Sequence, residues 1–291
     1  MDNKNDVAVC YLMWLPYGED FFYRFFESYQ CFPAGCPHDL IILFNGTRYA
    51  GGIEKYLQYL DEKNIRYSYQ TMAEGLDFTA YFHLAANTSH PYICLLNTSS
   101  VIRAANWLEL LFSPIRRNPQ IALTGPSGSL ESFYSTTKRS NSLLLKKGQN
   151  RREYFGKIKL IVKNLLYWRF LFRPFPNFHI RTAAFLVERE IFLQYPQRSP
   201  QRKFQAYLIE SGRNSLTNFV RKKQRLAFFV DKYGNLFDGA NAFRSNVFRK
   251  QGQEDLLISD KQSEWFAAAS PDEQKRLTQN AWGTLSGTPG Q

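Results

Sequence analysis

The chain has 291 residues, of which 44% are hydrophobic and 16% aromatic, so it carries enough apolar side chains for a sizeable core and is not a disordered polypeptide. Its net charge of +12 is concentrated, because residues 138–181 alone carry a net +11, with Glu153 as their single acid. The four cysteines lack paired metal-type spacing, which argues against a zinc protein, and no apolar run approaches the ~20 residues that span a bilayer.

The first half of the sequence alternates between short apolar runs and amphipathic segments. The predicted strands are residues 7–14, 39–44, 65–69, 92–96 and 121–124. The predicted helices between them are residues 20–29, 53–62, 78–87 and 107–117. This alternation indicates an α/β fold with a mostly parallel central sheet and helices on both faces. Because ligands bind at the carboxyl ends of such strands, the polar segments at residues 16–17, 45–46 and 97–100 are candidate site loops.

The alternation stops in the second half. Residues 127–142 are rich in Ser and Thr and are predicted to form a loop, whereas residues 156–173 are predicted to form a helix that ends at Pro174. On that helix, Lys159, Lys163, Arg169 and Arg173 fall within a ~120° arc at ~100° per residue, opposite a mainly apolar side. Beyond it we expect a strand at 182–187, a helical stretch at 203–221, a strand at 226–230 and polar helices after residue 251.

This basic helical insert has more than one interpretation. A cationic helix that carries aromatic residues is typical of a segment lying on an anionic membrane surface, or of one that contacts a lipid-linked or polyanionic acceptor. The same helix is equally consistent with a lid whose apolar side packs on the core. Clustered Lys and Arg also suit nucleic acid, but no zinc finger, aromatic RNA-binding run or helix-turn-helix supports that partner.

Two stretches of the first half carry a family resemblance. They are GLDFTA at residues 75–80 and YICLLNTSS at residues 92–100, with Asn87 between them and Asn106-Trp107-Leu108 downstream. Their order resembles the core of family 2-type glycosyltransferases with the GT-A fold, of the bacterial surface-polysaccharide type. In those enzymes a Gly-rich helix start precedes a strand that ends in Asp-x-Asp. On this alignment Asn97 and Ser99 occupy the two Asp positions.

The resemblance implies roles for residues along most of the chain, roughly residues 6–260. The expected donor-binding residues are Pro16, Tyr17, Asn45, Gly46, Asp77, Asn97 and Ser99. Glu210, in Ile209-Glu210-Ser211-Gly212, falls where the family's Glu-Asp motif supplies the catalytic base. Arg181 and Lys203 are expected to contact phosphate or acceptor, and Asp260 is a second candidate base or acceptor residue.

Each of these residues also has an ordinary structural interpretation. Residues 97–100 are equally suited to a turn that caps a following helix, and Asp77 to the first turn of a helix. Glu210 has the alternative of a surface acid beside a helix kink, and Arg181 and Lys203 that of solvated charges. Amide and hydroxyl oxygens bind Mg²⁺ or Mn²⁺ poorly compared with carboxylates, so no tightly held metal is expected. The diphosphate charge then has to be met by Lys, Arg or helix N-termini.

The resulting hypothesis is an inverting glycosyltransferase that uses a UDP- or GDP-type sugar donor and a surface-glycan or lipid-linked acceptor. We expect one domain over residues 1–285, with a nucleotide-binding half at 6–125, the basic insert at 126–180 and an acceptor half at 181–285, followed by a disordered tail at 286–291. The polar start MDNKNDVAV lacks the pattern of a signal peptide, so we expect a cytoplasmic protein, peripheral at the inner face of the membrane through residues 156–173. The alternative from another class is an inactive GT-A-like protein that binds glycan or a partner, or a peripheral membrane binder.

Overall fold

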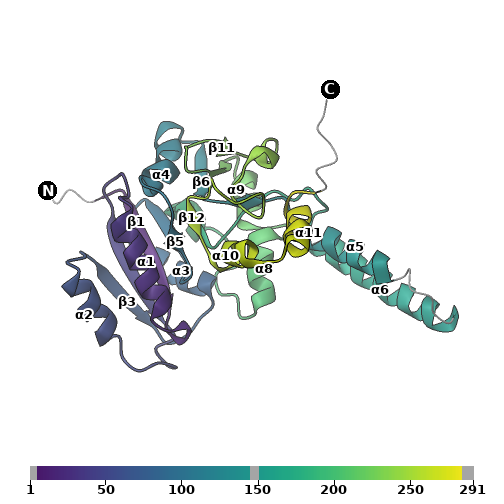
Figure 1. The fold of residues 1–291 in the computed structure, drawn as a ribbon, viewed down its shortest axis with the longest axis horizontal. Helices are drawn as coiled ribbons and strands as arrows, with labels where there is room; N and C mark the ends of the chain where they lie inside the picture. Colours follow the sequence, from purple (N-terminus) through teal and green to yellow (C-terminus); the bar gives the residue numbers. More distant parts are fainter. Residues whose placement is uncertain (1–4, 145–150, 284–291) are drawn as a thin grey trace.

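The computed structural model describes residues 5–144 and 151–283, and an eight-stranded sheet forms its centre (Figure 1). In chain order its strands are β1 (Val7–Trp14), β2 (Asp39–Asn45), β3 (Ser68–Met72), β4 (Tyr92–Leu96), β6 (Ile121–Gly125), β9 (Ala184–Glu188), β10 (Leu226–Val230) and β11 (Leu236–Phe237). Their order across the sheet is β11-β10-β6-β9-β4-β1-β2-β3, and all adjacent pairs are parallel except those made by β9 and β11.

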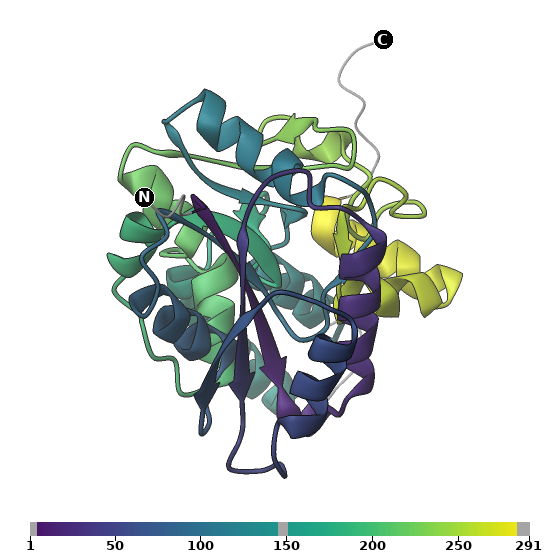
Figure 2. The ribbon, with the colours of Figure 1, turned by 90° about the vertical axis from the view of Figure 1, so that its left-hand side faces the viewer.

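Helices cover both faces of this sheet. One face carries α1 (Asp20–Cys31), α2 (Glu54–Glu62) and α4 (Trp107–Arg117), and the other carries α3 (Asp77–Ala86), α7 (Arg189–Leu193) and α9 (Leu216–Lys222). Figure 2 shows α1 and α2 on one side of β1 to β3 and α3 on the other. The alternation of a strand explains this, since Val9 and Tyr11 of β1 face the first layer while Cys10 and Leu12 face the second.

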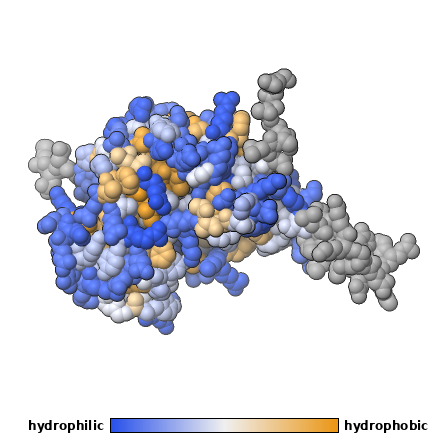
Figure 3. Space-filling model, in the orientation of Figure 1, coloured by the Kyte–Doolittle hydropathy of each residue, from blue (hydrophilic) through white to orange (hydrophobic). Residues whose placement is uncertain are grey.

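The remaining elements are short strand pairs and helices outside the eight-stranded sheet. Short strands pair as β5 (Val101–Ile102) with β12 (Ile258–Ser259) and as β7 (Gly128–Ser129) with β8 (His179–Ile180), both antiparallel. The other helical elements are η1 (Leu15–Tyr17), α8 (Lys203–Ser211), η2 (Ala242–Arg244), α10 (Lys261–Ala268) and α11 (Pro271–Trp282). On the face shown in Figure 3 the body is mostly hydrophilic with scattered apolar patches, as expected when the apolar residues fill two cores.

A helical arm extends from this body. It consists of α5 (Phe133–Leu144) and α6 (Arg151–Leu171), which lie side by side and project away from the sheet (Figure 1). The predicted loop at residues 127–142 is therefore wrong over most of its length. The Phe133 ring packs 4.6 Å from the Trp168 ring and 5.3 Å from the Phe172 ring, so contacts with α6 hold a helix that the Ser/Thr-rich sequence does not indicate by itself.

The predicted fold class, a mostly parallel sheet flanked by helices with a basic helical insert, is confirmed. Two further details differ from the sequence expectation. The strand predicted at 65–69 begins three residues later, at Ser68, and the helical stretch predicted at 203–221 is interrupted. The break follows from Gly212, where a Cβ would lie 2.5 Å from the Leu208 carbonyl oxygen, and from Ser215, whose side chain caps α9. The tail predicted at 286–291 lies outside the described residues.

Candidate active site

A cleft of about 1280 Å³ opens where β1 and β4 end. It brings together nine of the eleven predicted site residues, namely Pro16, Tyr17, Asp77, Asn97, Ser99, Arg181, Lys203, Glu210 and Asp260. Those residues come from the loop after β1, the start of α3, the turn after β4, the β8–β9 connection, α8 and the start of α10. Segments nearly 250 residues apart in sequence thus meet at the carboxyl edge of the parallel strands, where open α/β sheets bind ligands.

The other two predicted residues, Asn45 and Gly46, lie behind the cleft wall. Asn45 is 1% exposed, and its Nδ2 donates to the Gly75 carbonyl oxygen at 2.8 Å. Gly46 has φ +88°, and a Cβ there would lie 2.9 Å from both the Pro16 ring and the Trp14 ring. This pair therefore holds the start of α3 and the loop after β1 in place and does not line the cleft.

The turn after β4 is built around the Asn97 side chain. Its Oδ1 accepts hydrogen bonds from the Ser99 N–H and the Ser99 hydroxyl, both at 3.2 Å, and from the Ser100 hydroxyl at 3.1 Å. The Ser99 hydroxyl in turn accepts from the Lys261 N–H at 3.3 Å, which joins this turn to α10. The segment is a turn, but it caps no helix directly, because β5 follows and the next helix starts at Trp107.

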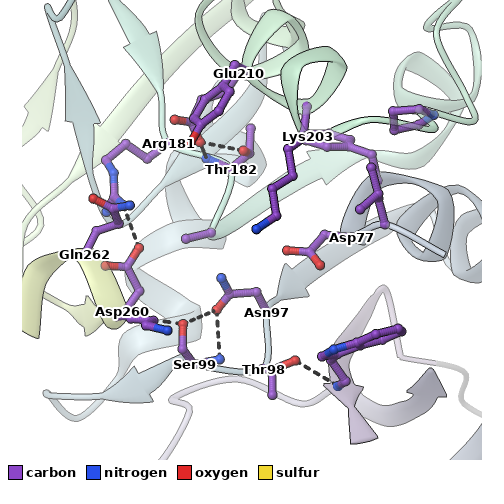
Figure 4. A pocket seen from close by; sticks show the side chains of 18 of the residues that line it. Asp77, Asn97, Thr98, Ser99, Arg181, Thr182, Lys203, Glu210, Asp260 and Gln262 are labelled. Atoms are coloured by element: carbon purple, nitrogen blue, oxygen red, sulfur yellow. Dashed lines mark hydrogen bonds and ion pairs between the residues drawn. The ribbon is translucent and has the colours of Figure 1, made fainter. Parts of the chain in front are cut away.

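This geometry does not suit a divalent metal in the position that the Asp-x-Asp resemblance suggests. The three hydrogen bonds occupy the Asn97 carbonyl oxygen, so its amide nitrogen faces the cleft (Figure 4). An amide N–H donates to anions and has no lone pair for a cation. Over residues 5–144 and 151–283, no group of three or more His, Cys, Asp or Glu side chains is arranged to hold a metal ion.

Asp77 is the first residue of α3 and lines the cleft opposite α8. The surrounding protein raises the pKa of its carboxyl, because solvation is lost near the cleft wall, although a hydrogen bond from its own backbone N–H opposes the rise. Lys203 reaches from α8 into the space between Asp77 and Asn97 (Figure 4). The predicted helix-start position of Asp77 and its predicted place at the ligand site are therefore compatible.

Glu210 is anchored through one carboxylate oxygen. Its Oε2 accepts from the Thr182 N–H at 3.0 Å and from the Thr182 hydroxyl at 2.6 Å. The Oε1 atom has no hydrogen-bond partner among the described residues, and the side chain lines the cleft. Anchoring one oxygen fixes the carboxylate while leaving the other able to accept a proton from a bound hydroxyl.

Arg181 and Asp260 form a buried ion pair, with the Arg181 Nη2 2.6 Å from the Asp260 Oδ2. The two residues are 7% and 5% exposed, and the guanidinium also stacks on the Phe248 ring at 3.7 Å. Burial alone would raise the pKa of Asp260. The charge of Arg181 and the Ser263 N–H, which donates to the Asp260 Oδ1 at 2.9 Å, outweigh burial and hold that pKa below its usual value. A carboxylate so fully occupied orders α10 and is poorly placed to take a proton.

Several cleft residues were not predicted from the sequence. Arg249 is 8% exposed and reaches Glu131 at 3.0 Å and Gln262 at 2.5 Å, forming a second ion pair whose acid is partly exposed. Loss of solvation lowers the pKa of this guanidinium, while Glu131 opposes the decrease. Thr182 and Lys261 directly follow the predicted residues Arg181 and Asp260. This adjacency was the only signal for them in the sequence. Arg249 had no comparable signal.

The charged residues of the cleft fall into two groups, those that form ion pairs and those that do not. Asp260 and Glu131 pair with arginines, and Glu74 at the rim pairs with Arg48. Within the described chain, neither the acids Asp77 and Glu210 nor the cations Lys203 and Lys261 form an ion pair. An arrangement of two free carboxylates and two free ammonium groups around one cleft is suited to binding an anion on one wall and accepting a proton on another.

Aromatic residues form one end of the cleft. Trp14 and Tyr49 meet edge to face with ring centroids 6.0 Å apart, and Tyr17 lies under the Lys261 ammonium at 5.5 Å. Tyr17 is 51% and Tyr49 is 60% exposed, so a ligand can reach both rings. Exposed aromatic rings beside a cation suit a flat, anion-bearing molecule.

Comparison with known proteins gives matches at the level of structure. No protein-family model matches the sequence, and no curated protein matches it. The mannosyltransferase PcManGT from Pyrobaculum calidifontis, in complex with GDP-Man and Mn²⁺, is 8% identical, with a TM-score of 0.48 over 98% of this chain and 71% of that one. The galactosyltransferase LgtC, in complex with donor and acceptor sugar analogs, is 10% identical, with a TM-score of 0.44 over 97% of each chain. GalNAc-T7 with UDP, GalNAc and Mn²⁺ is 17% identical, with a TM-score of 0.33, and the match spans 40% of this chain but 22% of GalNAc-T7.

Proposed function

We propose that the protein is a GT-A-type glycosyltransferase that binds a UDP- or GDP-linked sugar in the cleft and transfers the sugar to an acceptor hydroxyl with inversion. The observation that carries this proposal is the Glu210 carboxylate, anchored at one oxygen by Thr182, with its other oxygen lacking a partner among the described residues, in the same cleft as the Asn97 amide and Lys203. These groups supply a base and an anion-binding wall, which transfer from a diphosphate requires.

We assign the nucleotide to the donor half of the site, within residues 6–125. Tyr17 and Tyr49 offer exposed rings for the base, and Trp14 lines the cleft beside them. The diphosphate would contact the Asn97 amide and, from the acceptor half, Lys203 and Lys261. Asp77 would orient hydroxyl groups of the transferred sugar. Because cations and amide donors meet the diphosphate charge, the proposed reaction needs no tightly held metal.

The acceptor half, within residues 181–285, accounts for the chemistry. The acceptor oxygen attacks the anomeric carbon while the Glu210 Oε1 takes the hydroxyl proton. The bond from that carbon to the diphosphate oxygen breaks, and the bonding electron pair leaves with the nucleoside diphosphate, whose charge Lys203 and Lys261 balance. A single displacement at the anomeric carbon, assisted by one base, inverts its configuration. We expect the transferred group to be a hexosyl or related sugar.

We further infer that the acceptor is a surface glycan or a lipid-linked saccharide, and that the protein works in the cytoplasm at the inner face of the membrane. The basic insert, residues 126–180, lies next to the cleft through Phe133, which lines it. Within the described residues, no helix is long and apolar enough to cross a membrane.

A panel of nucleotide sugars tests the proposal. Purified protein is expected to hydrolyse or transfer one UDP- or GDP-sugar, and to keep most of that rate in EDTA. Glu210→Gln is expected to lower kcat by at least about 100-fold, in the range typical of a lost general base. Glu190→Gln removes an exposed acid on α7 outside the cleft and is the matched control.

Two results would contradict the proposal in different ways. Full activity in Glu210→Gln would remove Glu210 as the base. Calorimetry that shows no binding of UDP, GDP or their sugars would favour the non-enzymatic alternative, a protein that binds glycan or a partner, since the Asn97 and Ser99 side chains are already engaged in a turn.

A further inference from the structure

The arm carries an apolar stripe that the sequence analysis did not identify. The expected apolar side of α6 is present, since Trp168 packs on Phe133 and Phe172 is fully buried. A second row of apolar side chains points outward, with Val162 49%, Leu166 67% and Phe170 77% exposed. The spacing i, i+4, i+8 places these three residues within an ~80° arc of the helix at ~100° per residue.

Basic side chains border this outer stripe. On the same helical projection Arg169 lies at one edge of the stripe and Lys163 at the other, while Arg173 follows at its end. All three are exposed, and none forms an ion pair with any residue that the structure describes. The Arg169 guanidinium also lies 5.8 Å from the centroid of the Tyr134 ring on α5. An exposed apolar row between unpaired cations is the arrangement of a helix that lies in a lipid interface, with its apolar side chains among the acyl chains and its cations at the headgroups.

We propose that the outer stripe, Val162, Leu166 and Phe170 with Lys163, Arg169 and Arg173, docks the protein on an anionic lipid bilayer. The charge of the arm selects this occupant over a dimer in which two arms meet. Residues 138–181 carry a net +11. Two such arms placed face to face repel each other, but an anionic headgroup layer neutralises both edges of the stripe.

The arm lies next to the cleft, so the proposed docking surface would hold the active site close to the bilayer. Phe133 lines the cleft, is 43% exposed and lies against Trp168 on the inner side of α6. Tyr207, which is 56% exposed, lines the same part of the cleft from α8. Aromatic side chains thus lead from the bilayer-facing helix to the cleft. This part of the inference rests on the proposed transferase function and assigns the acceptor to the lipid-anchored class.

Vesicle flotation tests the docking surface without requiring activity. The whole protein is mixed with vesicles of phosphatidylcholine, with or without phosphatidylserine, and is expected to float with the anionic vesicles alone. Leu166→Ser combined with Phe170→Ser is expected to lower the bound fraction at least about tenfold. Lys163→Gln, Arg169→Gln and Arg173→Gln together are expected to abolish the preference for phosphatidylserine.

The matched control makes the same kind of substitution, exposed apolar to Ser, at two positions outside the arm. Leu226→Ser combined with Tyr233→Ser removes two exposed apolar side chains far from the arm in sequence and is expected to float like the wild type. The four substituted apolar positions are all solvent-exposed, and unchanged melting temperatures will show that each variant is folded. Donor hydrolysis in solution is expected to be unchanged in the Leu166/Phe170 variant, which separates docking from catalysis.

Three outcomes would overturn the inference. The first is wild-type protein that does not float with anionic vesicles. The second is equal flotation of the Leu166/Phe170 variant. The third is a concentration-dependent dimer in vesicle-free buffer that this variant abolishes, because the stripe would then cover a second copy. Loss of transfer to every acceptor, with flotation intact, would count against the proposed function and the lipid-anchored acceptor and leave the docking surface standing.

Discussion

The two oxygens of the Glu210 carboxylate have different surroundings, and Thr182 creates the difference. Both hydrogen-bond donors of Thr182 point to Oε2, at 3.0 and 2.6 Å, and come from the chain just before β9. The family resemblance implied the role of Glu210 but gave no sign of Thr182, which lies 28 positions away. A base is useful only when its oxygen is held in line with the attacking hydroxyl, so we propose Thr182 as a positioning residue.

Thr182→Val tests this role because it removes the hydroxyl and keeps the side-chain shape and the backbone N–H. A hydrogen bond to a charged group is worth ~1.5–3 kcal/mol, so kcat is expected to fall about 10- to 100-fold while KM for the donor stays unchanged. Thr182→Ser restores the hydroxyl and should recover most of the rate. Steady-state kinetics check this, and equal loss in the Val and Ser variants would contradict a positioning role.

In the proposed mechanism the Asn97 amide meets part of the diphosphate charge. Asn97→Asp keeps an acceptor for the three hydrogen bonds of the turn, so the fold is expected to persist. It also replaces an amide donor with a negative charge beside the proposed diphosphate. At an effective dielectric constant of about 20, two unit charges ~4 Å apart repel by about 4 kcal/mol, so the metal-free rate is expected to fall at least about tenfold.

A divalent cation should reverse part of that loss. Carboxylates are the ligands that Mn²⁺ and Mg²⁺ prefer, so Mn²⁺ is expected to stimulate Asn97→Asp more than the wild type. Initial rates in EDTA and in Mn²⁺ measure the effect, with Asn64→Asp, an exposed residue after α2, as the control. An unchanged metal-free rate in Asn97→Asp would show that this amide does not face the diphosphate.

At the scale of elements, α10 is held over the cleft by a contact that links residues 79 positions apart. Asp260 caps the helix through Ser263 and pairs with Arg181, whose backbone N–H is fixed by the Ser127 carbonyl oxygen at 3.1 Å. The helix start in turn carries Lys261, one of the two free lysines of the cleft. The ion pair therefore helps to set the shape of the site. The Arg181 guanidinium is already paired with Asp260, so it is not an unpaired charge for a ligand.

Asp260→Asn removes the ion pair but keeps the helix cap, since Asn also caps helices well. It leaves the buried Arg181 guanidinium uncompensated, which costs ~3–5 kcal/mol, and the free energy of unfolding in urea should fall by that amount. Asp272→Asn changes an exposed acid at the start of α11 and should shift it by less than ~0.5 kcal/mol.

The Arg181–Asp260 ion pair also predicts that the folded state loses stability at acidic pH. The folded-state pKa of Asp260 is depressed, so its stabilisation is present above the unfolded value, ~3.9, and is lost as the pH falls through the lower folded value. Wild-type melting temperature should therefore fall below about pH 4, and it should fall less in Asp260→Asn. A steeper decrease in the variant than in the wild type would contradict this assignment.

Elements that are defined by local pattern were predictable, and those defined by partners were not. Residues 7–14, 92–96 and 107–117 are apolar runs or an amphipathic helix, and β1, β4 and α4 have those bounds. α5 has no such pattern and exists through packing on α6. β9 was expected as a strand but its antiparallel place between β4 and β6 was not, because register and neighbours depend on contacts that are distant in sequence.

At the scale of the whole molecule, β9 joins the two proposed halves into one sheet. It pairs with β4 on one side and with β6 on the other, and both neighbours come from the first 125 residues. Leu186 of β9 lies in the core shared with α1 and α4, and Phe185 lies in the core on the opposite face. The proposed nucleotide-binding half therefore takes part of its core from the proposed acceptor half.

A fragment of residues 1–125 is therefore expected not to fold on its own. It would lack β9 and β10, which are the two strand neighbours of β6, and it would expose the edge of β4 together with apolar residues of both cores. We expect no sharp thermal transition and no fixed near-ultraviolet circular dichroism signal from the fragment, whereas residues 1–283 should melt in one transition. A fragment that melts cooperatively and binds nucleotide would show that the first half is an independent domain and that β9 is dispensable for it.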